Sequence, residues 1–134
     1  MKNSIPFSLA VTLIASLAIP AAARDLRTIN RMNVTAPSAS EIVVSGNAIR
    51  GARSYWCAGA DYSIRRLKAN LTDRLYVVGP FDRSHKTVTF STSGTRENSP
   101  SVVVLSNTIK EVGASLSVGQ ARSYCPDQDV YYSQ

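Results

Sequence analysis

The side chains best suited to chemistry gather in one segment, residues 54–70, which reads SYWCAGADYSIRRLKAN. The chain's only tryptophan stands there beside Cys57. A cysteine acts as a nucleophile when its thiol is ionised and a base lies within reach. The only histidine, His85, belongs to the polar stretch FDRSHK, which is typical of a solvated hairpin turn. The pattern therefore favours a structural role for Cys57 over a Cys–His catalytic pair.

Other patterns of catalysis or cofactor binding are missing from the sequence. It contains no CxxC, no glycine-rich phosphate loop and no GxSxG elbow. One histidine and two distant cysteines cannot form a zinc site without carboxylates from elsewhere. The acidic residues show no paired pattern typical of glycosidases. We expect no catalytic residue, no metal and no cofactor.

Four residues of the same segment are the candidate functional surface: Asp61, Tyr62, Arg65 and Arg66. On a helix, Asp61 and Arg65 would lie one turn apart, in the orientation that favours an ion pair worth about 0.3–0.5 kcal/mol. Tyr62 and Arg66 would be neighbours in the same way. The structural interpretation of this group is a helix ion pair, and the functional interpretation is a polar binding patch.

The first 23 residues are typical of a secretory signal peptide. Lys2 precedes an uncharged apolar run from Ile5 to Ile19, and Pro20 and three alanines follow. The run is shorter than the about 20 residues that a membrane span needs. We therefore expect cleavage after Ala23, a periplasmic or secreted protein, and no transmembrane span in the mature chain. An uncleaved membrane anchor is the alternative.

Export makes a prediction about the first residue of the protein. The mature chain should begin at Arg24, and N-terminal sequencing of the exported protein checks this. A retained Met1 in that material would contradict the expected location.

Charge and length limit the possible partners. The mature chain, 24–134, suits one domain, and without Lys2 the net charge of +6 falls to +5. The positive charge is dispersed, with one local cluster at Arg65, Arg66 and Lys68. Such a charge favours an anionic envelope component or an acidic protein as partner, although solubility alone would also explain it. Because aromatic residues do not interleave with the basic ones, nucleic acid is not an expected partner.

The two cysteines predict a disulfide. Exported proteins meet an oxidising compartment, and an even number leaves no thiol unpaired. Cys57 and Cys125 can form a single intramolecular bridge, which would close most of the mature domain. In the chain-entropy description, a loop of that size contributes at most about 4 kcal/mol to stability.

Hydrophobic periodicity predicts an α+β domain. Residues 48–69 have one apolar helical face, with Gly51 and Gly59 as weak points, so the helix could begin nearer Ser54. The apolar face consists of Ile49, Ala52, Trp56, Ala60, Ile64 and Leu67. Strands are predicted at 28–36, 41–46, 74–79, 86–92 and 101–113. The last segment is either one long strand or two strands with a break at Ser106 and Asn107.

The strands should form a single antiparallel sheet of about four to five strands with the helix packed on one face. Residues 114–125 are ambiguous, although Ser117 could cap a short helix there. A β-sandwich is the alternative, and the long helical pattern argues against it.

The segment YWCAGADYSIRR, together with the later ARSYC, resembles a group of uncharacterised small exported proteins of Gram-negative bacteria. The residues that carry this resemblance are Tyr55, Trp56, Cys57, Ala58, Asp61, Tyr62 and Cys125. It implies export and the shared two-cysteine layout, and it transfers no catalytic residue.

The sequence therefore favours an exported, non-enzymatic domain that binds a protein or an envelope component. The alternative is a small hydrolase or transferase whose site is assembled from scattered Asp, Arg, Tyr and Ser residues.

Overall fold

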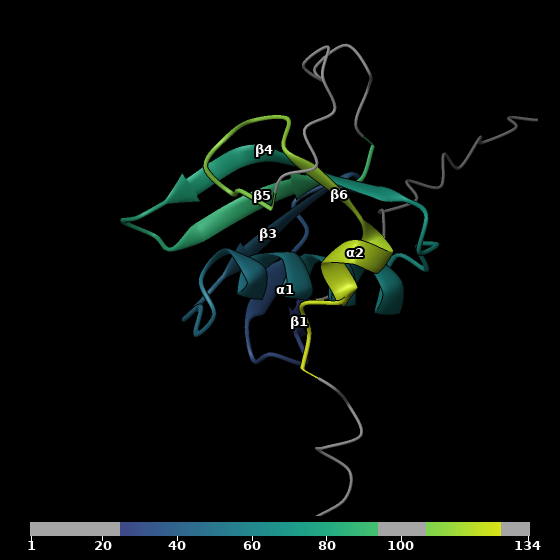
Figure 1. Cartoon of the computed structure of the whole chain (residues 1–134), viewed down its shortest axis with the longest axis horizontal. Helices are drawn as coiled ribbons and strands as arrows, with labels where there is room; N and C mark the ends of the chain where they lie inside the picture. The colour runs from purple at the N-terminus through teal and green to yellow at the C-terminus, as the bar shows by residue number, and fades with distance from the viewer. Residues whose placement is uncertain (1–24, 94–106, 127–134) are drawn as a thin grey trace, which may run out of the picture.

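The computed structural model describes residues 25–93 and 107–126 and has one antiparallel sheet with helices packed against it (Figure 1). The strands are β1 Leu26–Arg27, β2 Asn33–Thr35, β3 Glu41–Ser45, β4 Arg74–Asp82, β5 Thr87–Ser91 and β6 Ser115–Ser117. Their order in the sheet is β1-β2-β3-β5-β4-β6. The helices are α1 Ala52–Arg65 and α2 Val118–Arg122. The α+β class and the single antiparallel sheet are confirmed, and the six strands slightly exceed the expected number.

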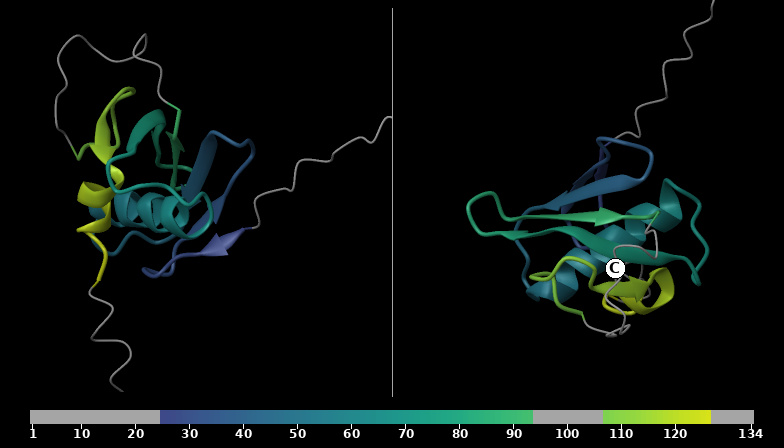
Figure 2. Two further views of the ribbon diagram at one scale, coloured as in Figure 1. Left: turned by 90° about the vertical axis from the view of Figure 1, so that its right-hand side faces the viewer. Right: turned by 90° about the horizontal axis from the view of Figure 1, so that it is seen from above.

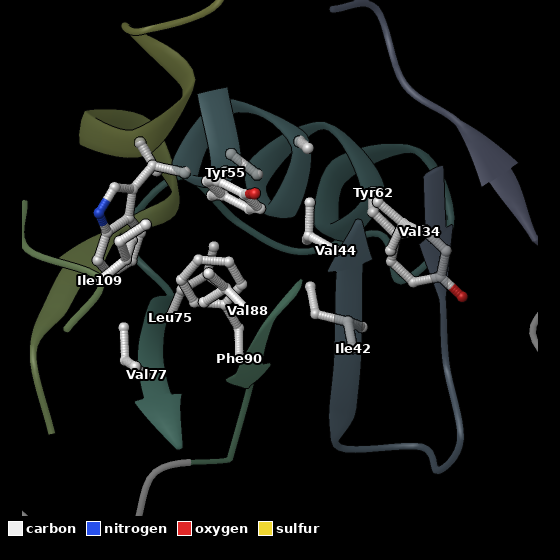
Figure 3. Close-up of a cluster of buried hydrophobic side chains, with 14 of the residues drawn as sticks. Val34, Ile42, Val44, Tyr55, Tyr62, Leu75, Val77, Val88, Phe90 and Ile109 are labelled. Atoms are coloured by element: carbon white, nitrogen blue, oxygen red, sulfur yellow. The ribbon is translucent and has the colours of Figure 1, made fainter. Parts of the chain in front are cut away.

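The central strands follow the alternation seen in the sequence. In the β3–β5 pair, Ile42 lies opposite Phe90 and Val44 opposite Val88. All four side chains are buried on the face that carries α1 (Figure 3). The intervening Thr87 and Thr89 are only partly covered. This alternation is the reason that a strand with one wet face could be predicted from the sequence.

Strand β4 is longer than expected, because Gly79 and Pro80 do not stop it. The strand continues to Asp82, with shifts of register against β5 on both sides of Gly79. A Cβ atom at Gly79 would lie 2.8 Å from Cβ of Thr89, so only glycine allows the two strands to pair this closely. The resulting β4–β5 hairpin projects beyond the rest of the sheet (Figure 2).

The predicted single strand at 28–36 is wrong. The chain instead forms a short hairpin of β1 and β2 around a turn in which Arg31 adopts φ 63°. Within this turn, the Thr28 amide donates to the Met32 carbonyl at 2.9 Å, and the Arg31 amide donates to the Thr28 carbonyl at 2.9 Å. The alternation of Met32 and Val34 persists, and both side chains are buried.

Helix α1 is shorter than the predicted 48–69 at both ends. It begins after Gly51, which has φ 62°, and ends before Lys68, which has φ 55°. Ile49 was expected on the buried face but lies in the turn before the helix with 92% of its surface exposed. Trp56 and Ala60 are fully buried, as predicted. Gly59 permits close packing on the sheet, since a Cβ atom there would lie 3.3 Å from Phe90.

Trp56 is the largest side chain of the core. Its ring centroid lies 4.7 Å from that of Phe90, and its Nε1 donates a hydrogen bond of 2.7 Å to the Asn107 carbonyl. The indole therefore packs against the sheet and also ties down the chain that leads to β6.

The C-terminal part of the domain differs from the predicted long strand at 101–113. Residues 101–106 lie outside the described residues, and 107–113 form a loop. The expected cap at Ser117 is confirmed: its hydroxyl accepts from the Gln120 amide, and the Gln120 side chain accepts from the Ser117 amide, both at 3.1 Å. Neither described helix has the length and hydrophobicity needed to cross a bilayer.

Two buried tyrosines predict opposite effects of removing a hydroxyl. Tyr62 Oη is buried without a hydrogen-bond partner among the described residues. Tyr55 Oη donates to the Lys86 carbonyl at 3.1 Å. Tyr62→Phe should therefore leave stability unchanged or raise it, whereas Tyr55→Phe should cost about 0.5–1.5 kcal/mol in a urea titration at neutral pH. Equal losses in both variants would contradict this difference.

The same tyrosines predict how stability changes with pH. Burial raises the pKa of both phenols above the usual value, and for Tyr62 the Arg66 charge opposes this rise in part. The unfolded chain ionises first, so the folded state should lose stability as the pH rises above about 10. Tyr62→Phe should reduce this alkaline loss, which the same urea titrations repeated at high pH would measure.

Candidate functional site

Cys57 and Cys125 form a disulfide bridge, with their Cα atoms 4.9 Å apart. Cys57 is fully buried on α1, one residue after Trp56, and no free cysteine remains. The bridge joins α1 to the segment that follows α2. The predicted pairing is confirmed, and with its sulfur in the bridge Cys57 has no thiol to act as a nucleophile.

Asp61 is a buried carboxylate with structural partners. Only 2% of its surface is exposed, and one of its oxygens accepts from the Ile29 amide at 2.9 Å and from Arg65 at 3.1 Å. Arg122 of α2 lies 4.0 Å from the other oxygen. The carboxylate therefore ties the β1–β2 turn and α2 to α1, as buried charges in proteins are normally paired.

The four residues predicted as a functional surface do not form one surface. Asp61 and Tyr62 belong to the core, whereas Arg65, the last residue of α1, and Arg66, which follows it, are exposed. The predicted ion pair between Asp61 and Arg65 is present. A role for these residues in binding stays a prediction, restricted by this geometry to the two arginines.

His85 lies in the exposed turn between β4 and β5. Its Nδ1 lies 2.7 Å from an oxygen of Asp82, and the Ser84 amide donates to the other oxygen at 2.8 Å. These hydrogen bonds, chiefly that with His85, lower the pKa of the Asp82 carboxyl. His85 thus serves the hairpin turn, and it lies far along the sequence from the disulfide.

A groove at the start of α1 is the feature of the described surface best suited to binding. We call it the basic groove; its volume is about 500 Å³. It is lined by Gly46, Asn47, Ala48, Ile49, Gly51, Ala52, Tyr55, Phe81, Arg83, Lys86, Ile109 and Lys110. Volumes of about 300–1,000 Å³ are typical of sites for small ligands.

The floor of the basic groove is apolar and held in place by contacts between three parts of the chain. The Tyr55 and Phe81 rings meet edge to face with centroids 5.6 Å apart. The Phe81 amide donates to the Ile109 carbonyl at 2.8 Å, which joins the loop before β6 to β4. The Tyr55 hydroxyl reaches the backbone of the β4–β5 hairpin at Lys86. The groove is therefore formed before any ligand arrives.

The rim of the basic groove carries positive charge. Arg83 and Lys86 come from the β4–β5 hairpin and Lys110 from the loop before β6, and all three are exposed. Among the residues that the structure describes, no carboxylate lines the groove. Helix α1 has no acidic residue in its first turn and no capping side chain, so the positive end of its dipole adds to this potential.

No protein-family model, curated protein or solved structure matches the chain. The groove must therefore be interpreted from its own residues. Within residues 25–93 and 107–126, no three His, Cys, Asp or Glu side chains come close enough together to hold a metal ion.

Two smaller hollows border α1. One, of about 290 Å³, shares Ile49 with the basic groove and is lined by Arg31 and Arg50. The other, of about 320 Å³, lies near the end of the helix and includes both Lys68 and Asp73. The hollow next to the basic groove is therefore also lined by cations and, among the described residues, by no carboxylate. The hollow at the far end of α1 differs, because it contains a carboxylate beside its cation.

The sequence contains only weak signals for the basic groove. Ile49 fits the helical face and was expected to be buried, and nothing local marks it as exposed. The cations of the groove are scattered over residues 83–110, and the hydrogen bonds of the loop to β4 and to Trp56 bring Lys110 to the hairpin. The glycine at 51 was a weak point of the predicted helix, and it is where the turn that exposes Ile49 ends.

Proposed function

We propose that the protein is an exported, non-enzymatic binding domain that contacts an anionic component of the cell envelope through the basic groove. The observation that supports this most strongly is the composition of the groove, an apolar floor beside three cations with no carboxylate. Such a lining attracts an anion by charge and provides apolar area for burial.

The lining residues favour binding over catalysis. They include no histidine, cysteine, serine, aspartate or glutamate, which are the usual nucleophiles and general bases. The Tyr55 hydroxyl donates to a backbone carbonyl, and burial raises the pKa of this phenol. The alternative of a small hydrolase or transferase is less favoured, because the strongest polar cluster, around Asp61, is buried and paired.

Export to the periplasm or the medium is part of the proposal. The signal-peptide pattern of residues 1–23 and the resemblance carried by YWCAGADY support it. The disulfide is compatible with an oxidising compartment. In that location, anionic lipids and lipopolysaccharide are available partners for a basic groove.

The proposal predicts charge-selective binding to lipid surfaces. Vesicles of phosphatidylglycerol should bind the exported protein in a sedimentation assay, and vesicles of phosphatidylcholine should bind it much less. Raising the salt from about 0.01 to about 0.15 M should weaken the binding several-fold, because exposed charges are then screened over about 8 Å. Equal binding to both kinds of vesicle would contradict an anionic partner.

A further inference from the structure

We infer that the ligand of the basic groove is an amphiphile with an anionic head group, whose acyl chain lies on the apolar floor and whose head group meets the cations of the rim. This inference rests on the proposed function and narrows it to one class of ligand. The occupant is a single lipid-like molecule held by the groove, as opposed to a membrane surface or an acidic protein.

The apolar floor of the groove favours a ligand with an apolar part. Ile49 is 92% exposed and stands at the wall of the groove, where it offers apolar surface that a ligand can bury. Tyr55, Phe81 and Ile109 continue the apolar lining. Tyr55 and Ile109 are themselves buried, so the surface left to cover is that of Ile49 and part of Phe81. A flexible acyl chain can cover these two side chains, whereas a hydrated anion alone would leave Ile49 in water.

The cations of the rim favour an anionic group at one end of that ligand. Arg83, Lys86 and Lys110 approach the groove from two segments, and no carboxylate of the lining neutralises them. Arginine and lysine donate charge-assisted hydrogen bonds to phosphate and carboxylate oxygens. A neutral amphiphile would cover the floor but would gain nothing from these three charges.

The fixed shape of the groove favours a small ligand over an acidic peptide. Its residues are held by the contacts of Tyr55 with Phe81 and Lys86, and of Phe81 with Ile109. The turn before α1 is fixed as well, because the Arg50 amide donates to the Ser54 hydroxyl at 3.0 Å. A preformed hollow lowers the entropic cost of binding. An acidic peptide would pair with the cations and leave most of this hollow unfilled.

A series of ligands tests the inference by calorimetry below the micelle concentration of each amphiphile. The series is dodecyl phosphate, decyl phosphate, dodecyl maltoside, inorganic phosphate and hexaglutamate. Dodecyl phosphate should bind most tightly, and decyl phosphate should bind up to about 15-fold more weakly, since two methylenes are lost. The neutral maltoside and inorganic phosphate should each bind at least tenfold more weakly than dodecyl phosphate.

Matched variants locate the site without disturbing the fold. Ile49→Ala removes exposed apolar surface from the groove and should lower the affinity for dodecyl phosphate several-fold. Leu71→Ala removes a side chain that is 60% exposed and lies outside the groove, and it should have no effect on binding. Equal loss in both variants would overturn the placement of the acyl chain.

The failures of the two proposals can be distinguished. If hexaglutamate binds as tightly as dodecyl phosphate, or if chain length has no effect on affinity, the inference of an amphiphilic ligand is wrong. The proposed function, binding of an anionic partner, is not contradicted by that result. If neither the anionic ligands nor the anionic vesicles bind, the proposed function itself is wrong.

Discussion

Replacing both Cys57 and Cys125 with serine should lower the free energy of unfolding by roughly 2–5 kcal/mol, the usual cost of removing a native bridge from a small secreted domain. The bridge spans 68 residues and joins the buried side of α1 to the end of α2. The C-terminal segment has other anchors as well: Val118 and Ala121 are buried, and Arg122 lies near Asp61. The Val118 and Gly119 amides also donate to backbone carbonyls of the segment before β4. Arg53 also stacks over Tyr124, 5.4 Å from the ring centroid.

Thermal melts and urea titrations of the double variant measure this loss. The control is the wild-type protein, unfolded and refolded under reducing conditions. Its free energy of unfolding should be similar to that of the double variant. A single Cys→Ser change should be about as harmful and should release one reactive thiol. An unchanged melting temperature, or two free thiols in oxidised and denatured wild-type protein, would contradict the disulfide.

Trp56→Ala should cost about 3–5 kcal/mol, the range for removing a large buried aromatic side chain. The change leaves a cavity beside Phe90 and removes the hydrogen-bond donor of the Asn107 carbonyl. Ile49→Ala is the control, because both residues were predicted on one helical face and only Trp56 is buried. The control should stay within about 0.5 kcal/mol of wild type.

Urea unfolding followed by far-UV circular dichroism compares the two variants, since the tryptophan signal is lost in one of them. Trp56→Phe helps to separate the cost of the cavity from the cost of the lost hydrogen bond. It keeps an aromatic ring and removes only the indole donor and some volume. It should be clearly less harmful than the alanine change. Similar losses for Ile49→Ala and Trp56→Ala would contradict the boundary of α1 at Gly51.

Trp56 also links the core to the basic groove. Its Nε1 holds the carbonyl of Asn107, two residues before Ile109, which lines the groove. Ile109 in turn accepts from the Phe81 amide through its carbonyl. The position of the groove wall therefore depends on a core side chain that touches no ligand.

Features with strong local signals could be predicted from the sequence. The alternation in β5 placed Val88 and Phe90 in the core, and helical spacing did the same for Trp56. Ser117 was proposed as the cap of a short helix, and two cysteines in an exported chain allowed a single pairing. Each of these depends on periodicity, capping chemistry or counting.

Features that depend on contacts between distant segments could not be predicted. The β1–β2 turn contains no glycine or proline, so alternation alone suggested one strand. Strand β4 continues past Gly79 because pairing with β5 outweighs the local stop signal. Asp61 was expected at the surface, yet Ile29, from a distant turn, and Arg122, from α2, surround it.

The basic groove belongs to the same category. Its floor comes from α1, from β4 and from the loop before β6, and the turn before α1 adds Ile49 at the wall. The only cluster of cations visible in the sequence, at Arg65, Arg66 and Lys68, lies at the opposite end of α1. The charge pattern along the chain therefore points to the opposite end of the helix from the basic groove.

Binding of anionic vesicles by two matched charge-removal variants tests the central claim most directly. One variant, R83Q/K86Q/K110Q, removes the cations of the basic groove; the other, R27Q/R66Q/K68Q, removes the same net charge from exposed residues outside it. Arg65 is left intact in both, because it pairs with Asp61. We predict that the groove variant loses at least tenfold in affinity for phosphatidylglycerol vesicles at low salt, while the control loses only a few-fold. Equal losses in the two variants would show that net charge alone drives binding and would contradict the groove as the binding site.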